Sequence, residues 1–364
     1  MKQPLIGSYL ESDCLFLLKK LEPKFYSIEK KEELIQSGKL HYSQLVSQES
    51  RPTKEYEKMF HTLTSKYKQK LAQEVLHLSY LISKNVKQGV CIVSLVRAGT
   101  PIGVLVNRGI NQYSQYNSVH YSISIVRDKG IDVNALDYLI FDLEIPPESI
   151  VFIDGWTAKG IITKELKQAI DKYNTSRKVN IINNLYVISD IGGTADYSVT
   201  HDDYAIPSAL MNSTVSGLIS RSVINEQIAY DDFHGCISYE HLSEFDYSNW
   251  FVDEISACFN KLDYQPPLVQ SDTQRKTRHH LTQKYISKLM NDFHVCDINR
   301  IKPGIAEATR VMLRRIPDLL LVKNKDNPNT VHLIRIANEK GISVIELPEM
   351  PFGACALIKD VLKK

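Results

Sequence analysis

The stretch "IVFIDGWTAKGIIT", residues 150–163, decides the fold of this chain. Four apolar residues, typical of a buried strand, run directly into Asp154, and a short loop containing Gly155 and Gly160 leads into a helical pattern. The two glycines permit the backbone conformations of a tight turn. Since ligands bind beyond the carboxyl ends of strands in open α/β sheets, we expect the Asp154 carboxylate to face a ligand crevice.

A helix is predicted to begin near Lys159, because Ile162, Leu166, Ala169 and Ile170 then share one apolar face. The free N–H groups and the positive dipole end of such a helix attract negatively charged oxygen. Further donors around the same turn are Thr157, Lys159 and Thr163. The carboxylate ahead of the turn suits sugar hydroxyls, or a metal ion held through water.

An upstream segment, "CIVSLVRAGTPIGVLVNR" (91–108), repeats the arrangement of strand, loop and helix. Its loop reads Arg97-Ala98-Gly99-Thr100, with Thr100 as a favourable cap and Pro101 in the first helical turn. The sequence therefore predicts two anion-binding turns at one edge of the same sheet.

The strand-like runs are "CIVSLV" (91–96), "SVHYSISIV" (118–126), "IVFI" (150–153) and "LYVIS" (185–189). Helical patterns separate them and also fill the first 80 or so residues, which predicts an α/β fold with a mostly parallel sheet. A helix is also expected over residues 208–225, with small polar residues on one face that either pack closely or line a pocket. Arg221 is the residue of this segment that we would test. Arg127 and Asp128 end another strand, either as active-site groups or as a solvated charged turn.

The stretch around Asp154 resembles the phosphoribosyl-pyrophosphate (PRPP) signature of type I phosphoribosyltransferases. In that family a second acidic residue follows the first, but this sequence has Gly155 at that position. Lys159 and Ile162 likewise occupy the positions of two threonines of the phosphate-binding loop. The resemblance implies that residues 97–100 hold a diphosphate and residues 159–163 a 5′-phosphate. It also implies that Asp154 holds ribose hydroxyls or, indirectly, Mg²⁺, and that a mobile loop carries Arg127 and Asp128.

The combination "SLVRAGTPIG", "DGWTAKG", "IPSALMNSTVSGLISR" and "FHG" is similar to the bacterial StiP family. Its members join a divergent phosphoribosyltransferase-like domain to a Pelota-type RNA-binding domain, and the family carries the label "cysteine protease". The boundaries that we expect are 1–263 for the first domain, 264–299 for a linker and helix, and 300–364 for the second domain.

The segment "KPGIAEATRVMLRR" (302–315) resembles the start of the L7Ae/Pelota RNA-binding fold, which often reads G-x-N-E-x-T-K. The resemblance implies an RNA-binding face formed by Gly304, Glu307, Arg310, Arg314 and Arg315. Spacings of three and four residues place the middle three on one side of a helix. Between Asp272 and Lys364 there are 17 Lys and Arg against 10 Asp and Glu, an excess that suits either a polyanion partner or a solvated basic surface. A helix is expected at the end, over residues 354–364.

Three functions remain open at this level. One is a phosphoribosyltransferase-like enzyme that binds a phosphorylated ribose or nucleotide, and another is a non-enzymatic nucleotide-sensing RNA-binding regulator. The third is a cysteine protease, for which Cys236 and His234 are the candidate nucleophile and base. The six cysteines are scattered, as in a reduced cytoplasmic protein, and no run is apolar over the ~18 residues that a membrane span needs.

Overall fold

The computed structural model describes residues 3–86, 89–261 and 272–362, and its centre is a six-stranded sheet. All neighbouring strands in it run parallel, which confirms the fold class expected from the sequence. In spatial order the strands are β1 (Leu15–Leu17), β4 (Ser118–Ile123), β3 (Val90–Leu95), β7 (Ile150–Thr157), β8 (Leu185–Asp190) and β9 (Tyr197–Thr200).

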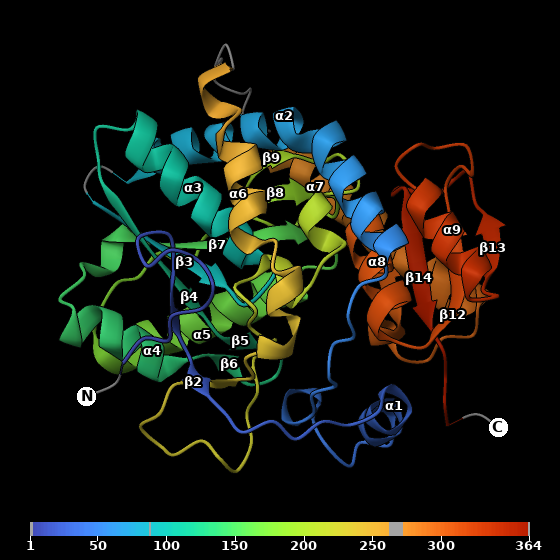
Figure 1. The fold of residues 1–364 in the computed structure, drawn as a ribbon, viewed down its shortest axis with the longest axis horizontal. Helices are drawn as coiled ribbons and strands as arrows, with labels where there is room; N and C mark the ends of the chain where they lie inside the picture. Colours follow the sequence, from blue (N-terminus) through green and yellow to red (C-terminus); the bar gives the residue numbers. More distant parts are fainter. Residues whose placement is uncertain (1–2, 87–88, 262–271, 363–364) are drawn as a thin grey trace.

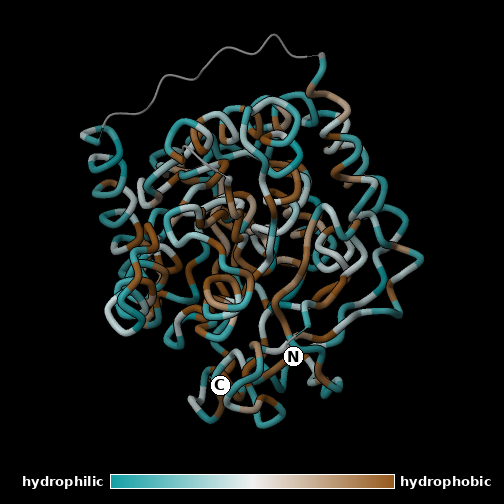
Figure 2. Tube along the Cα trace, turned by 90° about the vertical axis from the view of Figure 1, so that its left-hand side faces the viewer, coloured by the Kyte–Doolittle hydropathy of each residue, from teal (hydrophilic) through white to brown (hydrophobic). Residues whose placement is uncertain are grey.

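Helices cover both faces of this sheet (Figure 1). One face carries α2 (Lys54–Asn85), α3 (Gly99–Tyr113) and α6 (Ser248–Ser256); the other carries α4 (Val133–Asp137) and α5 (Ile161–Arg177). Strand β7 is apolar on both faces, because successive side chains of a strand point to opposite sides of the sheet. Val151 and Ile153 pack into the first apolar layer, and Ile150 and Phe152 pack into the second. Figure 2 shows the hydrophobic segments gathered at the centre of the molecule.

Helix α7 (Asp272–Asp292) falls in the segment predicted as linker and helix, and the second domain contains a four-stranded mixed sheet in the order β11-β14-β12-β13. Its elements are β11 (Ile301–Pro303), α8 (Ile305–Arg314), β12 (Pro317–Val322), α9 (Val331–Glu339), β13 (Ser343–Glu346) and β14 (Ala354–Ile358). This sheet stands beside α2 (Figure 1), and Ile305 and Leu333 join the apolar cluster of the first domain. The part of the predicted linker over 264–271 lies outside the described residues.

Two expected helices are wrong. Residues 354–358 form the central strand β14, buried throughout, since a short apolar run fits a buried strand as well as a helix. Residues 208–225 form short 3-10 turns, including Ser213–Val215, and Gly217 and Leu218 have positive φ angles of 71° and 59° that end any helix there. Strand β7 also continues through Asp154 to Thr157, instead of ending at residue 153.

The helical pattern expected over the first 80 or so residues is confirmed only from Lys54 on, in α2. The first 53 residues are mostly irregular and contain only short elements: β1, β2 (Lys19–Lys20), α1 (Ile28–Gln36) and a 3-10 turn (Tyr42–Gln44). Two small ladders complete the chain. Strand β2 pairs with β10 (Gly235–Cys236), and β5 (Ile125–Val126) forms a hairpin with β6 (Gly130–Ile131).

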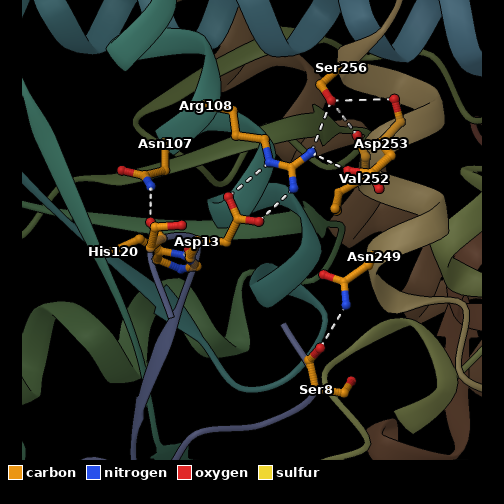
Figure 3. Close-up of polar contacts among 10 residues, drawn as sticks. Ser8, Asp13, Asn107, Arg108, His120, Asn249, Val252, Asp253 and Ser256 are labelled. Atoms are coloured by element: carbon orange, nitrogen blue, oxygen red, sulfur yellow. Dashed lines mark hydrogen bonds and ion pairs between the residues drawn. The ribbon is translucent and has the colours of Figure 1, made fainter. Parts of the chain in front are cut away.

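Arg108 of α3 ties the irregular start of the chain to the helices above the sheet (Figure 3). Its guanidinium donates to both carboxylate oxygens of Asp13, at 2.8 and 2.5 Å, and to Asp253 and Ser256 of α6 at 2.7 and 3.0 Å. Since all of these groups are satisfied by one another, we interpret the shallow groove around them as structural.

Candidate functional site

The loop that follows β3 lies against β7 at Asp154 and Gly155, in the second half of that strand. A Cβ on Gly99 would lie 2.6 Å from the carbonyl oxygen of Ile153 and 3.4 Å from Oδ1 of Asp154. A Cβ on Gly155 would lie 3.2 Å from the carbonyl oxygen of Ala98. Only glycine permits this approach, so the two motifs form one continuous site.

Asp154 lies at the centre of this junction, partly buried. Burial raises the pKa of its carboxyl to about 7, although Oδ1 accepts a hydrogen bond from the Gly155 N–H at 2.8 Å and Arg310 acts in the opposite direction. An acid with a pKa near neutrality can accept or release a proton at physiological pH.

The raised pKa of Asp154 predicts how stability depends on pH. Below pH 4 the carboxyl is neutral in the folded and unfolded states; above that, the unfolded chain releases the proton first, so ionisation opposes folding increasingly up to about pH 7. An Asp154→Asn variant should therefore gain thermal stability over the wild type as the pH rises from 4 to 8. Unfolding temperatures across this range would measure it, and a constant difference between the two proteins would contradict it.

The polar face of α8 covers the same junction. Glu307 accepts hydrogen bonds from Nε1 of Trp156 at 3.2 Å and from Arg310 at 2.6 Å, and the Arg310 guanidinium lies 5.7 Å from the centre of the Trp156 ring. Burial alone would raise the pKa of Glu307, but the positive charges of Arg310 and Lys302 lower it to about 2. Glu307 and Arg310, expected to face RNA, thus contact the first domain in this arrangement.

The predicted phosphate turn at residues 159–163 is largely occupied by the chain itself. Nζ of Lys159 donates to the carbonyl oxygens of Ile298 and Ile301, both at 2.9 Å, and burial lowers the pKa of this amine to about 7. The Thr157 hydroxyl lies 3.0 Å from that of Thr194. Gly160 caps α5 with a φ of 75°, as the turn requires. The prediction of an open anion-binding turn at residues 159–163 is therefore wrong for this arrangement, because Lys159 is bound to residues that lead into β11.

Two threonine hydroxyls of the predicted loops are inside the protein. That of Thr100 is fully buried and lies 2.7 Å from the Ser122 hydroxyl, so it cannot bind a diphosphate. The hydroxyl of Thr163 is buried without a hydrogen-bond partner within the described residues.

A cavity of about 360 Å³ lies beside this junction, between the first domain, residues 28–56 and the second domain. It brings together three arginines that the sequence had assigned to three different places: Arg97, Arg221 and Arg314. The ionisable side chains that line it, tyrosines aside, are Lys31, Glu49, Arg51, Arg97, Arg221, Arg314, Glu339 and Lys340. Positive charge clearly exceeds negative charge around this cavity.

Arg97 and Arg221 are each only partly satisfied. Arg97 pairs with Glu49 and donates to the Ile219 carbonyl oxygen at 3.1 Å, but its buried Nε has no acceptor among the residues that the structure describes. Arg221 donates through Nη2 to the carbonyl oxygens of Tyr42 and Leu45, whereas its buried Nη1 has no acceptor in that part of the chain. Burial lowers the pKa of Arg221 to about 10.

Arg314 is the least satisfied of the three arginines. Within residues 3–86, 89–261 and 272–362 its guanidinium forms no hydrogen bond or ion pair, and its Nε is completely buried. Burial, together with the charges of Arg310 and Arg97, lowers its pKa well below the ordinary value. Glu49, the nearest counter-charge, already accepts from Arg97 and from the Ser213 hydroxyl at 2.6 Å. Such unpaired cations are typical of a site for an anionic ligand.

The turn with Arg127 and Asp128 lies nearby without lining the cavity. Asp128 has a φ of 66°, and Arg127 donates to the side chain of Asn299 at 2.6 Å. The guanidiniums of Arg127 and Arg221 lie 5.0 and 5.3 Å from the centre of the Tyr42 ring. The turn is a short hairpin that contacts the second domain.

Sequence reasoning missed the contribution of the N-terminal region. Glu49, Lys31 and Arg51 belong to a segment with no motif, and only the tertiary structure brings them to the arginines. A buried glutamate cannot be recognised from a polar, irregular stretch such as "SQESRPTKEY".

The structure separates the candidate protease residues. Cys236 is fully buried in β10, and burial raises the pKa of its thiol to about 12. Nδ1 of His234 lies 2.8 Å from the Ser124 hydroxyl, and Nε2 of His241 lies 2.9 Å from the carbonyl oxygen of Glu49. Each imidazole is thus engaged elsewhere. A thiolate–imidazole pair involving Cys236 is absent from the described part of the chain.

Thiol labelling checks this placement. Five cysteines are buried and Cys296 is exposed, so iodoacetamide should modify one thiol per native chain quickly and all six in denaturant. Mass spectrometry of the labelled peptides would identify them. Rapid native labelling of Cys236 would contradict the arrangement described here.

Comparison with known proteins places both parts of the chain. Residues 7–256 match the family described as "Tellurite-like stress resistance cysteine protease StiP", and residues 280–360 match the PELOTA RNA binding domain. A protein of Acinetobacter baylyi named "Cysteine protease StiP" is 39% identical over 375 residues, which cover 100% of this chain and 96% of that protein. None of the described helices has the length and apolar character required to cross a bilayer.

Proposed function

This chain belongs to the StiP family and carries a Pelota-type RNA-binding domain. We propose that its first domain binds a phosphorylated ribose or nucleotide and that its second domain binds RNA. The observation that carries this proposal is the cavity in which Arg97, Arg221 and Arg314 each keep a buried N–H group for which the described residues supply no acceptor. Phosphate oxygens are the acceptors that guanidinium groups bind best.

The size and position of the cavity support this class of ligand. A volume of about 360 Å³ lies within the range of small-molecule sites, and the adjacent strand ends are where α/β sheets bind ligands. Arg97 belongs to the loop that resembles a diphosphate-binding loop, so a diphosphate-bearing sugar such as PRPP is the first ligand to test. Asp154 lies beside Gly99 of that loop but does not line the cavity, so its contact with ribose hydroxyls is the part of the proposal that the Asp154→Asn variant tests.

Mg²⁺ does not fit a site made by the protein alone. Among the described residues no group of three or more Asp, Glu, His or Cys side chains could hold a metal ion. Asp154 is a lone carboxylate whose pKa is about 7. We therefore assign Mg²⁺ no role except as an ion that accompanies the phosphates of the ligand.

Ligand sensing and glycosyl transfer both begin with this binding event. The occupied turn at Lys159 favours sensing, since a group expected to hold the 5′-phosphate is bound to the second domain. The junction of Asp154 with Gly99 favours transfer, since it brings the carboxylate that resembles a ribose-binding acid beside the loop that resembles a diphosphate-binding loop. Proteolysis, which the family name suggests, requires in addition that Cys236 become accessible to substrate and to a base.

Calorimetric titration of the full chain tests the proposal. PRPP, pyrophosphate, ATP, AMP and ribose 5-phosphate would be compared, and pyrophosphate release from PRPP would be followed in parallel. Arg221→Gln should weaken binding about 10- to 100-fold, the effect of one charged hydrogen bond. Arg177→Gln is the control and should bind as the wild type does, because it removes an exposed arginine of α5 that pairs with Asp137 of α4.

The outcomes separate the functions. Binding without turnover supports sensing; pyrophosphate release that Asp154→Asn abolishes supports transfer. No binding of any of the five compounds, or equal binding by Arg221→Gln, overturns the proposal. Turnover of peptides that Cys236→Ala abolishes would instead establish the protease.

A further inference from the structure

Backbone amides at the N-terminus of α8 and in the loop at Gly353 both donate hydrogen bonds to one carboxylate of the first domain. Oδ1 of Asp203 accepts from the N–H of Ile305 at 2.8 Å, and Oδ2 accepts from the N–H of Gly353 at 2.7 Å. Two segments of the second domain, about 50 residues apart, thus aim their backbone donors at one anionic group. This is the arrangement by which proteins bind a phosphate at a helix N-terminus.

The first domain lies close to this pair of backbone donors at Gly304 and at Gly353. A Cβ on Gly304 would lie 2.7 Å from Cδ1 of Ile191, and a Cβ on Gly353 would lie 3.3 Å from Oδ2 of Asp203. Gly304 has a φ of 94°, which turns the chain into α8 against that surface. No nucleic acid backbone fits between the two domains while they are in this contact.

Every residue that the Pelota resemblance assigned to RNA meets the first domain or the N-terminal region. Gly304 faces Ile191, Glu307 and Arg310 contact Trp156, Arg314 lines the cavity with Arg97, and Arg315 pairs with Glu32. Lys159 and Arg127 add hydrogen bonds to residues just before β11.

We propose that the first domain masks the RNA-binding face of the second, with the Asp203 carboxylate occupying the position of an RNA phosphate. RNA then binds only a form in which the second domain has moved away. RNA and the first domain compete for the same amides, so weakening their contact raises the affinity for RNA. Phosphate contacts supply much of the affinity of RNA-binding proteins, so a carboxylate at that position is an effective competitor.

The cavity extends this competition to the small ligand, a step that rests on the proposed function. Arg97 comes from the first domain and Arg314 from the second, so a phosphate bound by both holds the masked form. By linkage, such a ligand lowers the affinity for RNA by the same factor by which RNA lowers the affinity for the ligand.

Binding of a fluorescent RNA hairpin with an unpaired bulge, followed by anisotropy with the full chain, tests the masking. Asp203→Ala should bind this RNA about 5- to 150-fold more tightly than the wild type, the usual range for coupled sites. Lys159→Ala, which leaves the second domain unchanged, should also bind more tightly. Asp202→Ala is the matched control, since this carboxylate pairs with Lys70 of α2 at 2.5 Å and should leave RNA affinity unchanged.

The possible results separate the masking proposal from the proposed ligand site. Equal affinities of wild type, Asp203→Ala and Lys159→Ala, or no binding by any of them, overturn the masking. Saturating pyrophosphate should weaken RNA binding by the wild type; if pyrophosphate binds but RNA affinity stays constant, the coupling fails and the proposed ligand site stands. If pyrophosphate does not bind while Asp203→Ala gains RNA affinity, masking stands and the proposed function fails.

Discussion

An Arg314→Met variant should unfold at a higher temperature than the wild type and yet lose most of its affinity for pyrophosphate. The Arg314 side chain is partly buried beside Arg310 and Arg97, with its Nε fully buried and no hydrogen-bonded acceptor among the described residues. Methionine fills similar space without charge. Removing an unpaired, partly buried cation should stabilise the free protein by roughly 1–3 kcal/mol. Removing one partner of a desolvated phosphate contact costs about 2–4 kcal/mol, a 30- to 1000-fold loss of affinity.

The opposite signs make this test specific. Thermal unfolding with and without pyrophosphate measures both effects in one experiment, since a bound ligand raises the unfolding temperature. Arg177→Met serves as the control and should change both quantities little, because its ion pair with Asp137 is exposed. A destabilised Arg314→Met variant that binds pyrophosphate normally would show that Arg314 is structural.

The neighbouring arginine should behave in the opposite way. Arg315 donates to both carboxylate oxygens of Glu32, one of them at 2.8 Å, and Glu32 is completely buried. Arg315→Met leaves that carboxylate buried without its counter-charge, which should destabilise the protein by roughly 2–4 kcal/mol. Two adjacent residues at the C-terminal end of α8, Arg314 and the C-cap Arg315, should thus shift the unfolding temperature in opposite directions when each is changed to methionine.

A second change tests the cause. Glu32→Gln in the Arg315→Met background removes the unpaired charge and should recover at least half of the loss, the coupling that a double-mutant cycle measures. Denaturant unfolding of the four proteins gives the energies. Full additivity, or a loss below about 0.5 kcal/mol in Arg315→Met, would show that the pair contributes nothing.

The sequence predicted the parallel sheet because its four central strands are apolar runs separated by helical patterns. Strands β1, β9 and β11 were missed, since each has only three or four residues and pairs through distant partners. The sequence predicts a helix for the β14 segment, because five apolar residues in a row carry no usable period.

The candidate site was predicted in parts. The loops at Gly99 and Asp154 follow from local patterns, and Arg97, Arg221 and Arg314 were each singled out. Their common cavity was beyond sequence reasoning, because it depends on how the second domain packs against the first and on Glu49 in an irregular segment. The same packing explains the turn at Lys159. The local sequence predicts that it is open to a phosphate, but Lys159 donates its hydrogen bonds to residues that lead into β11.

The most direct measurement is a crystal structure of the full chain with pyrophosphate. The account predicts phosphate oxygens within about 2.7–3.2 Å of guanidinium nitrogens of at least two among Arg97, Arg221 and Arg314. Pyrophosphate at the Lys159–Thr163 turn instead, or a cavity closed by side chains that pair all three arginines internally, would contradict it.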